Sequence, residues 1–412
     1  MKSPEDFSML DPKVSSEPWD LYQVLHEQCP VYQMPETGAF VVTRYEDLRA
    51  VLKNHEAFSS DVGSLGGGQF ASIHREILEN GGGWPHVSTL QRTDPPIHDR
   101  YRKLLDRVFT ISRVRELTSH IDQVVDLLID RFVDRGECEF NDEFAMPMPG
   151  IIIAEQLGLD AGKVEIFKKW ADAMLGAARA AVATEDEVRA NAEMELEAQL
   201  FLADIFEKRR KQPSDDLMSA LVHSHGEDEE PLTMAELQNV MHQLITGGFE
   251  TTQTAINHGM WTLIRHPELQ NKLREDESLI KPFVDEVLRW ESPVQFLARR
   301  AVQDVKMGDT LITKDSMVLV GYGAANRDKE KFECPHQFDI DRRNAGANLA
   351  FGSGKHFCPG ALLAKQEMMS SFKSLLDRLE DVKLAKPLPE PVHRFSLFFM
   401  PMHDFYISFK KR

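Results

Sequence analysis

The residue with the clearest capacity for chemistry is Cys358, which lies near the end of a glycine-rich stretch running from Phe351 to Gly360. Pro359 follows it, and proline suits a first helical turn because its missing N–H would be unpaired there anyway. The pattern therefore predicts a cysteine at a helix N-terminus, where backbone N–H groups and the helix dipole favour a thiolate. Such a thiolate can be a nucleophile or the axial ligand of a haem iron, although most unpaired cysteines are inert core residues.

A second group lies in the middle of a long helical pattern, where Gly247 and Gly248 precede Phe249, Glu250 and Thr251. Two adjacent glycines cost a helix about 1–2 kcal/mol relative to alanines, so something should compensate. Glycines remove side chains where another body approaches the backbone closely. That body could be a crossing helix, with Glu250 in a salt bridge, or a bound group served by the acid and the hydroxyl.

Two charged pairs share helix faces. Glu286 and Arg289 stand at positions i and i+3, and His98 and Arg102 at i and i+4. Alone, the first pair is most simply a solvated surface ion pair. The second pair could bind an anion or could simply be exposed to solvent.

The elements that must position these residues are mainly helical. The chain has 412 residues, of which 42% are hydrophobic, enough for a large core. Amphipathic periodicity predicts helices over 112–135, 160–181, 185–211 and 233–266, and alternation predicts strands over 39–43, 309–320 and 395–409. We expect one large domain over 1–412, mainly α with small β-sheets, with β-rich parts at 1–60, 295–350 and 390–412 and helical parts at 95–290 and 359–380.

Residues 61–90 form an irregular, glycine-rich segment with a short helical piece inside it. A long loop of this kind in a compact domain is either functional or disordered. It carries Phe70, Trp84 and Leu90, apolar residues that a purely solvated loop would not need. We therefore expect a flexible substrate-access loop over a binding cavity.

Composition and charge exclude several classes of function. The chain has 48 Lys and Arg against 66 Asp and Glu, a net charge of −18 that repels nucleic acid and anionic membranes. Four scattered cysteines argue for a reducing cytosol and against a disulfide framework or zinc ribbon. We see no signal peptide and no apolar stretch of about 20 residues that would span a bilayer. A cytoplasmic, monomeric protein is expected.

Together these residues resemble the cytochrome P450 family of haem-thiolate monooxygenases, in its soluble bacterial type. The family's pattern Phe-x-x-Gly-x-His/Arg-x-Cys-x-Gly is filled by Phe351, Gly354, His356, Cys358 and Gly360. Its small-Gly-x-acid-Thr pattern is filled from Gly247 to Thr251, and its Glu-x-x-Arg pair by Glu286 and Arg289. The resemblance implies the P450 fold, with haem between a long central helix and the cysteine loop.

The resemblance also assigns roles. It makes Cys358 the axial ligand of haem b iron, with Phe351 shielding the sulfur, and backbone N–H groups near Gly360 bonding to it. Gly247 and Gly248 let the long helix pass close over the haem. Glu250 and Thr251 become the catalytic pair that delivers protons during oxygen activation. The positions expected to bind the haem propionates are His98, Arg102, Arg299 and His356.

Two points within the resemblance depend on details that the sequence leaves open. Arg300 adjoins Arg299, and strand register decides which of the two points inward. Many family members carry an arginine at the position of Gln337, where it completes an ion network with the Glu-x-x-Arg pair. Here His336, Arg342 or a backbone group would have to replace it.

The expected reaction uses O2 and two electrons, which NAD(P)H supplies through a ferredoxin reductase and a ferredoxin. A basic cluster on the cysteine side should dock an acidic ferredoxin, and it comprises Arg100, Lys103, Arg107, Lys355 and Lys365. Two other classes stay open, namely a peroxide-using or non-oxygenating haem-thiolate enzyme and a non-catalytic haem-dependent binding protein. Glu250 and Thr251 argue against both.

The substrate is expected to be an apolar small molecule, such as a terpenoid, steroid, fatty acid or aromatic compound, that is hydroxylated or epoxidised. The candidate lining residues are apolar and come from the glycine-rich loop, the long helix and the strand regions. They are Trp84, Leu90, Leu244, Phe249, Val294, Phe296, Leu397 and Phe398.

Overall fold

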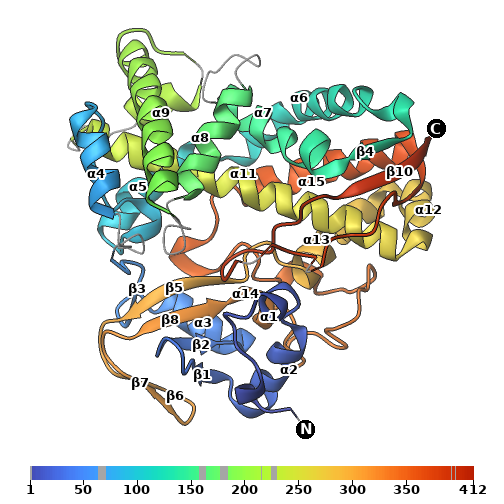
Figure 1. The fold of residues 1–412 in the computed structure, drawn as a ribbon, viewed down its shortest axis with the longest axis horizontal. Coiled ribbons are helices and arrows are strands. Elements are labelled where there is room, and N and C mark those ends of the chain that lie inside the picture. The colour runs from blue at the N-terminus through green and yellow to red at the C-terminus, as the bar shows by residue number, and fades with distance from the viewer. Residues whose placement is uncertain are drawn as a thin grey trace. The chain divides into compact units, whose positions relative to one another are not determined.

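The computed structural model describes residues 2–63, 71–156, 164–176, 184–214, 216–223, 230–390, 392–394 and 396–412 (Figure 1). These residues form two compact units. The first comprises Met1–Ser60, Val114–Met148 and Glu250–Arg412, and the second Asp61–Arg113 and Pro149–Phe249. The single domain expected over 1–412 stays a prediction. Residues 64–70 of the expected access loop, and both ends of the helix expected over 160–181, lie outside the described residues.

The first unit contains a five-stranded sheet in the order β1-β2-β8-β5-β3, in which β2 and β8 are parallel and the other neighbours antiparallel. Its strands are β1 (Val31–Gln33), β2 (Phe40–Val42), β3 (Phe58–Ser59), β5 (Phe296–Ala301) and β8 (Met317–Gly321). A three-stranded antiparallel sheet has the order β4 (Glu137–Glu139), β10 (Tyr406–Lys411) and β9 (Leu379–Leu384), and β6 (Val305–Met307) pairs with β7 (Thr310–Ile312). Inner strands β2 and β8 are almost wholly buried, which explains their continuous apolar sequence.

The first unit also contains helices. They are α1 (Pro12–Ser16), α2 (Trp19–Gln28), α3 (Tyr45–Lys53), most of α6 (Ile111–Asp130), α12 (Pro267–Glu275), α13 (Ile280–Trp290), α14 (Tyr322–Ala325) and α15 (Ala361–Arg378). Shorter turns are η1 (Pro4–Asp6), η3 (Val133–Arg135), η4 (Asn141–Ala145), η7 (Glu277–Leu279), η8 (Ala345–Ala347) and η9 (Gly354–His356). One core cluster joins α3 to the large sheet through side chains such as Leu48, Val51 and Val320.

The second unit is helical. Its elements are α4 (Ala71–Asn80), η2 (Leu90–Arg92), α5 (Ile97–Val108), most of α7 (Pro147–Gln156), α8 (Val164–Gly176), α9 (Glu185–Lys211) and α10 (Leu217–His223). Helix α9 confirms the prediction over 185–211, and its start has a physical cause. Thr184 and Glu187 form a capping box, in which the hydroxyl accepts from the Glu187 N–H and the carboxylate accepts from the Thr184 N–H.

Helix α11 (Met234–Arg265) has 32 residues and a length of about 48 Å, and it contributes residues 234–249 to the second unit and 250–265 to the first. Thr233 and Glu236 form a capping box at its start, in agreement with the helix expected over 233–266. The helix runs through Gly247 and Gly248 without interruption. Despite its length, it is not apolar enough to cross a membrane, and the same holds for every other described helix.

Two predicted elements differ from the structure. The helix expected over 112–135 ends at Asp130, and η3 follows. The strand expected over 395–409 begins only at Tyr406, and the preceding described residues make isolated bridges such as Val294 to Phe399. Pro401 lies in that stretch, and proline cannot donate a ladder hydrogen bond. The strands expected over 39–43 and 309–320 appear as β2 and as the separate strands β7 and β8.

Candidate functional site

The cysteine loop is closed by its own backbone. The N–H of Cys358 donates to the carbonyl of Phe351 at 2.9 Å, and the N–H of Gly352 donates to that of Leu349 at 2.8 Å. Gly354 has a φ of +74°, and a Cβ there would lie 2.8 Å from the carbonyl oxygen of Leu52 on α3. A side chain is therefore excluded at this position by both conformation and space. These contacts hold Cys358 in a defined place.

Cys358 precedes α15 rather than standing in its first turn. The helix begins at Ala361, and Gly360 is its N-cap residue, so the expected helix start at Pro359 is wrong. The carbonyls of Cys358 and Gly360 accept from the N–H groups of Ala361 and Ala364. A Cβ at Gly360 would lie 3.9 Å from the cysteine Sγ, at ordinary van der Waals distance. Cys358 is partly exposed, in keeping with a sulfur that binds a ligand rather than filling a core.

The register of β5 separates the two neighbouring arginines. Arg299 is opposite Val318 on β8 and only 7% exposed, whereas the Arg300 side chain is 39% exposed and pairs with Asp315 at 3.2 Å. The buried guanidinium of Arg299 donates to the Ala298 carbonyl at 2.8 Å and hydrogen-bonds the Tyr322 hydroxyl. The strand therefore turns Arg299, and not Arg300, inward.

Arg299 provides a test of whether the site fits haem. Buried charged side chains are almost always paired, yet among the described residues no carboxylate forms an ion pair with Arg299. A buried cation with only neutral partners matches an anionic group such as a haem propionate. His356, from the cysteine loop of the same unit, places its Nε2 2.9 Å from the Ser60 hydroxyl. The donor set and the partly exposed Cys358 both fit a haem.

The other two expected propionate ligands lie on α5 in the second unit. His98 is 1% exposed, and its Nδ1 lies 3.3 Å from the carboxylate of the adjacent Asp99. The Nε of Arg102 donates to Asp106 at 2.8 Å, one helical turn further on. Each side chain therefore has an acidic neighbour on its own helix, and their role at the haem stays a prediction.

The glycine pair of α11 has two distinct environments. A Cβ at Gly248 would lie 2.5 Å from the side chain of Ile153, so this glycine permits the close approach of α7. A Cβ at Gly247 would meet no atom of the described residues within 4 Å. Phe249 is 3% exposed and packs against Phe167 of α8 at a ring-centroid distance of 6.5 Å. The helix-crossing interpretation thus accounts for Gly248, and Gly247 leaves space for another group.

Glu250 and Thr251 follow on α11 and belong to the same compact unit as the Cys358 loop. Glu250 is 8% exposed and Thr251 is half-buried. Farther along the helix, a Cβ at Gly259 would lie 2.1 Å from the ring of Phe372 on α15, which makes this glycine a second point of close helix approach. Residue spacing gives no sign of this contact, because the partner residue Phe372 is distant along the chain.

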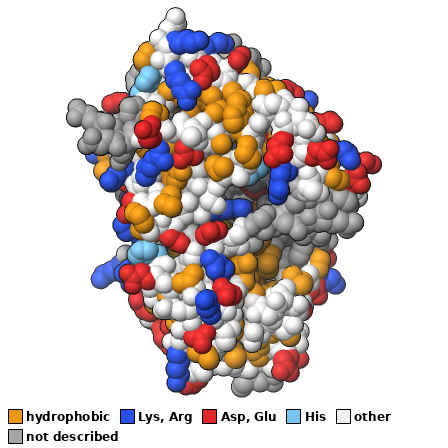
Figure 2. Space-filling view, turned by 90° about the vertical axis from the view of Figure 1, so that its left-hand side faces the viewer, with side chains coloured by type: hydrophobic (Ala, Val, Ile, Leu, Met, Phe, Trp, Pro, Cys, Tyr) orange, Lys and Arg blue, Asp and Glu red, His pale blue; other side chains and the backbone are white. Residues whose placement is uncertain are grey.

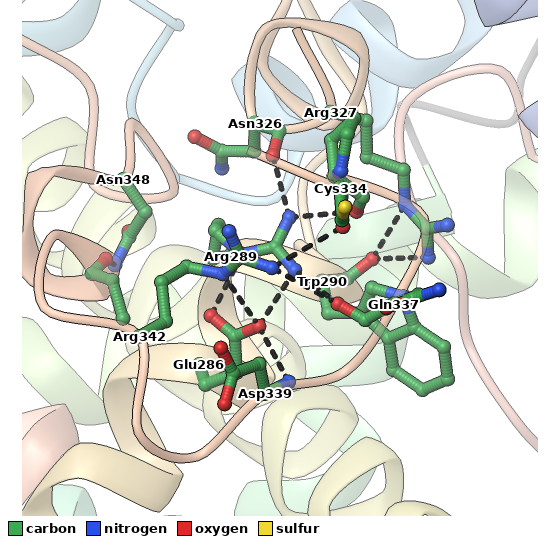
Figure 3. Close-up of polar contacts among 12 residues, drawn as sticks. Glu286, Arg289, Trp290, Asn326, Arg327, Cys334, Gln337, Asp339, Arg342 and Asn348 are labelled. Atoms are coloured by element: carbon green, nitrogen blue, oxygen red, sulfur yellow. Dashed lines mark hydrogen bonds and ion pairs between the residues drawn. The ribbon is translucent and has the colours of Figure 1, made fainter. Parts of the chain in front are cut away.

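Glu286 and Arg289 form a buried ion pair rather than a surface one (Figure 3). Both side chains are 0% exposed, and two parallel bonds of 2.7 Å join the guanidinium to the carboxylate. The remaining N–H groups of Arg289 donate to the backbone carbonyls of Asn326, Pro335 and Gln337 at 2.9, 2.9 and 3.1 Å. All five donors of this guanidinium are therefore used.

Gln337 stands where many family members have an arginine, and another residue supplies the guanidinium. Arg342 donates from Nε to Glu286 at 3.0 Å, and its Nη2 donates to the carbonyls of Cys334 and Gln337 (Figure 3). The Gln337 carbonyl thus accepts hydrogen bonds from both Arg289 and Arg342. Of the three substitutes that the sequence left open, Arg342 and a backbone group complete the network.

The network also fixes the chain that leads to the cysteine loop. Asn326 accepts the N–H of Leu349 at 2.6 Å and donates to the hydroxyl of Ser292 at 2.7 Å. Tyr322, whose hydroxyl contacts Arg299, follows directly after β8. Neither residue was expected to have a role, although the apolar run of β8 just before Tyr322 is a signal that could have placed it beside β5.

The eight expected pocket residues are divided between the units. Phe296 and Leu397 line one small cavity in the first unit together with Gln295, whose side chain accepts from the Tyr22 hydroxyl at 2.7 Å. The Gln295 N–H donates to the carbonyl of Phe398 at 2.7 Å. The second unit contains Trp84, Leu90, Leu244 and Phe249, and the first also contains Val294. A common pocket lined by all eight stays a prediction.

Comparisons with known proteins agree with the geometry. The sequence profile described as Cytochrome P450 matches residues 166–408. The 6-deoxyerythronolide B hydroxylase of Saccharopolyspora erythraea is 32% identical over 384 residues, which cover 91% of this chain and 92% of that protein. The mycinamicin IV hydroxylase/epoxidase of Micromonospora griseorubida is 33% identical over 383 residues, 91% of each chain. The structure of cytochrome P450 CYP109Q5 from Chondromyces apiculatus matches with a TM-score of 0.84 at 30% identity and covers 98% of both chains. The chain therefore belongs to the cytochrome P450 family and is a haem-dependent monooxygenase.

Proposed function

We propose that this chain inserts one oxygen atom of O2 into a C–H bond or a double bond of an apolar small molecule, with two electrons from a ferredoxin and its reductase. When bound, the haem supplies the binding and reductive cleavage of O2, which an axial thiolate favours. The loop closed between Phe351 and Cys358 holds that sulfur, and Arg299 offers a buried cation to a propionate. The observation that supports oxygen activation most directly is the pair Glu250 and Thr251 in the middle of α11.

The chemical balance explains why this pair is needed. Hydroxylation of RH by O2 consumes two electrons and two protons and yields ROH and one water. A carboxyl group can take up and release a proton, and a hydroxyl can donate and accept a hydrogen bond. Glu250 is nearly buried and Thr251 follows it on the same helix, and the two groups are proposed to act in succession in proton delivery. An enzyme that uses peroxide receives both oxygen and reducing equivalents together and does not need this route.

The decisive experiment replaces a hydroxyl by a methyl group at two adjacent positions. Thr251→Val should keep NADH consumption by the reconstituted system but lower product per NADH severalfold, with hydrogen peroxide released instead. Thr252→Val is the matched control, because Thr252 is the next residue of α11 and is 3% exposed. Product yields that are equal in Thr251→Val and the parent enzyme would contradict the proposal.

A second measurement separates the alternatives. With ferredoxin, reductase and NADH, consumption of NADH and O2 and formation of product should approach equal amounts. Full-rate product formation from hydrogen peroxide alone would instead favour a peroxide-using enzyme. Haem binding without turnover under either condition would favour a binding protein.

The ferredoxin is proposed to dock on basic residues that include Arg107 and Lys355, both exposed. Two members of the expected basic cluster have internal partners, since Lys365 pairs with Asp285 at 2.6 Å and Arg100 pairs with Glu236 at 3.0 Å. On the face drawn in Figure 2, the described residues carry both charge signs interspersed with apolar side chains. Because Asp285 is nearly buried, reversing Lys365 would also disturb folding, so it is a poor test of docking.

The docking test therefore uses Arg107→Glu and Lys355→Glu. Each should slow electron transfer from an acidic ferredoxin and weaken the dependence of the rate on salt concentration. Lys306→Glu is the control, because Lys306 is exposed on β6, away from the proposed docking residues in sequence. Rates and salt slopes equal to those of Lys306→Glu would exclude docking through these residues.

The proposed substrate class is apolar, and the two relatives suggest specific probes. Their names identify 6-deoxyerythronolide B and mycinamicin IV as the molecules they act on. A ligand library that contains these two compounds with terpenoids, steroids, fatty acids and aromatic compounds should include members that shift the Soret band on binding. The shape of the best ligands then defines the pocket, and a response only to polar compounds would contradict the apolar class.

A further inference from the structure

Two histidines and a glutamate converge in the second unit, and none of them is among the residues expected to bind the haem. His74 lies on α4, His86 lies in the segment that follows α4, and Glu195 lies on α9. One carboxylate oxygen of Glu195 is 3.0 Å from Nε2 of His74, and the other is 2.8 Å from Nε2 of His86. The three ligand atoms lie within 4.8 Å of one another. Sequence spacing gives no hint of the cluster, because its members come from three separate segments.

The backbone around the cluster is held tightly against α9. A Cβ at Gly81 would lie 2.1 Å from the side chain of Leu196, and one at Gly83 would lie 2.8 Å from Gln199 Oε1. That Oε1 accepts the N–H of Trp84 at 2.8 Å, and the Gln199 amide group donates back to the Trp84 carbonyl. These glycines permit close packing rather than mobility. They bring His86 to Glu195 in a fixed position.

A third histidine lies beside His86. The ring of His242 on α11 lies 5.3 Å from that of His86, centroid to centroid. The His242 ring hydrogen-bonds the backbone of Met174, whereas its buried Nε2 has no partner among the described residues. The Met174 bond therefore belongs to Nδ1, which leaves the lone pair of Nε2 available. A buried ring nitrogen in this state is the form of histidine that binds metals.

A second cluster of histidines and a glutamate, in the first unit, is not arranged to bind a metal ion. His258, Glu291 and His393 also have ligand atoms within 4.8 Å of one another. However, the two ring nitrogens of His258 face the carbonyls of Glu291 and Met400 at 2.9 and 3.0 Å, so neither points a lone pair into the cluster. Glu291 is already paired with Arg265. This cluster is a hydrogen-bonded ion group, and the cluster of the second unit differs from it in having nitrogens directed only at a carboxylate.

We propose that His74, His86 and Glu195 form a binding site for a transition-metal ion of the Zn²⁺ type. Two imidazoles and one carboxylate are a common zinc ligand set. Bonds of about 2.0–2.1 Å in a tetrahedral site separate ligand atoms by about 3.3 Å. The observed separations of 3.0 and 2.8 Å need only a small expansion. The His86 side chain is 40% exposed and provides a route of entry from solvent.

Binding moves the proton of each imidazole from Nε2 to Nδ1 by exchange with water, and it changes no oxidation state. In the metal-free cluster each Nε2 carries the proton that it donates to Glu195. In the bound state the proton of each neutral imidazole resides on Nδ1, and the Nε2 lone pair faces the metal. The ion then ties α4 and the segment containing His86 to α9. We expect it to hold this part of the second unit in place without entering the reaction at the haem.

The test is equilibrium dialysis of the haem-loaded protein against Zn²⁺, with metal counted by mass spectrometry. One zinc ion per chain is expected, with an affinity that falls more than about tenfold in Glu195→Gln and in His86→Ala. Glu197→Gln and His223→Ala are the controls, because these exposed residues lie on α9 and at the end of α10. Equal loss of affinity in the controls, or no loss in Glu195→Gln and His86→Ala, would overturn the site.

Two further readouts do not depend on variants that might fold poorly. Zinc-edge X-ray absorption of the parent protein should show nitrogen and oxygen neighbours with the outer-shell pattern of imidazole. Zn²⁺ should also slow amide hydrogen exchange in residues 71–86, and not in the β6–β7 hairpin of the first unit. Sulfur ligands in the spectrum, or unchanged exchange in residues 71–86, would refute the proposal. Both results are independent of monooxygenase activity.

Discussion

Replacement of Arg289 by lysine should destabilise the folded chain strongly, although it keeps the charge. Arg289 is 0% exposed, and each of its five N–H groups has an acceptor. Lysine has three donors on a single point charge and cannot make the two parallel bonds to Glu286. At least two acceptors in the buried network therefore lose their donor.

The magnitude follows from these losses. Each buried polar group left without a partner costs about 1–3 kcal/mol, and disruption of a buried ion pair costs about 3–5 kcal/mol. Arg342 still donates to Glu286 at 3.0 Å, so the carboxylate keeps one cationic partner. We therefore expect Arg289→Lys to lower the free energy of unfolding by about 3 kcal/mol, near the lower end of that range.

The assay is urea unfolding followed by far-UV circular dichroism and by haem absorbance, with midpoints compared at constant slope. Arg300→Lys is the matched control, because its partner Asp315 is 65% exposed and such pairs contribute about 0.2–1 kcal/mol. Glu286→Gln combined with Arg289→Lys should be less destabilising than the sum of the two single changes, because each alone leaves a buried charge poorly paired. If Arg289→Lys shifts the midpoint no more than Arg300→Lys, the network does not stabilise this fold as argued.

Three other outcomes are expected. Burial on α15 raises the pKa of Glu367 from 4.5 to about 8, and its Oε1 has no partner among the described residues. The unfolded chain thus loses this proton first, and the free energy of unfolding should fall as pH rises from about 4.5 to 8. Glu367→Gln should remove that part of the slope in urea midpoints, and an unchanged slope would contradict the assignment. Gly259→Ala should lower the melting temperature, since a Cβ would lie 2.1 Å from the Phe372 ring and overpacking costs about 1–3 kcal/mol. An unaltered melting temperature would show that α15 can move away from α11 at little cost. Gly247→Ala should leave the circular dichroism spectrum unchanged, because the added Cβ would meet no described atom within 4 Å. It should reduce the haem content per chain if the haem lies against this part of α11. Full haem content would show that the haem does not lie there.

The sequence by itself determined the helical character of the chain and its membership of the cytochrome P450 family. Periodicity predicted α9 and α11 closely, because capping boxes at Thr184 and Thr233 mark the starts of both helices by local hydrogen bonds. The spacing around Cys358 matched the cysteine-loop pattern of the P450 family, and the positive φ angles of Gly352 and Gly354 are local properties of the backbone. Such features depend on near neighbours, which a linear pattern contains.

Only the tertiary structure decided how distant residues combine. The register of β5 points Arg299 inward. Arg342 donates to Glu286 in the network where the family usually has a different arginine. Gly248 lies at a close contact between two helices. The tertiary structure also changed the interpretation of the segment after α4, whose glycines pack against α9 and bring His86 to Glu195. Each of these results depends on strand register or on side chains that are remote in sequence. The free energy of such contacts arises from burial and geometry in three dimensions, which residue spacing along the chain does not encode.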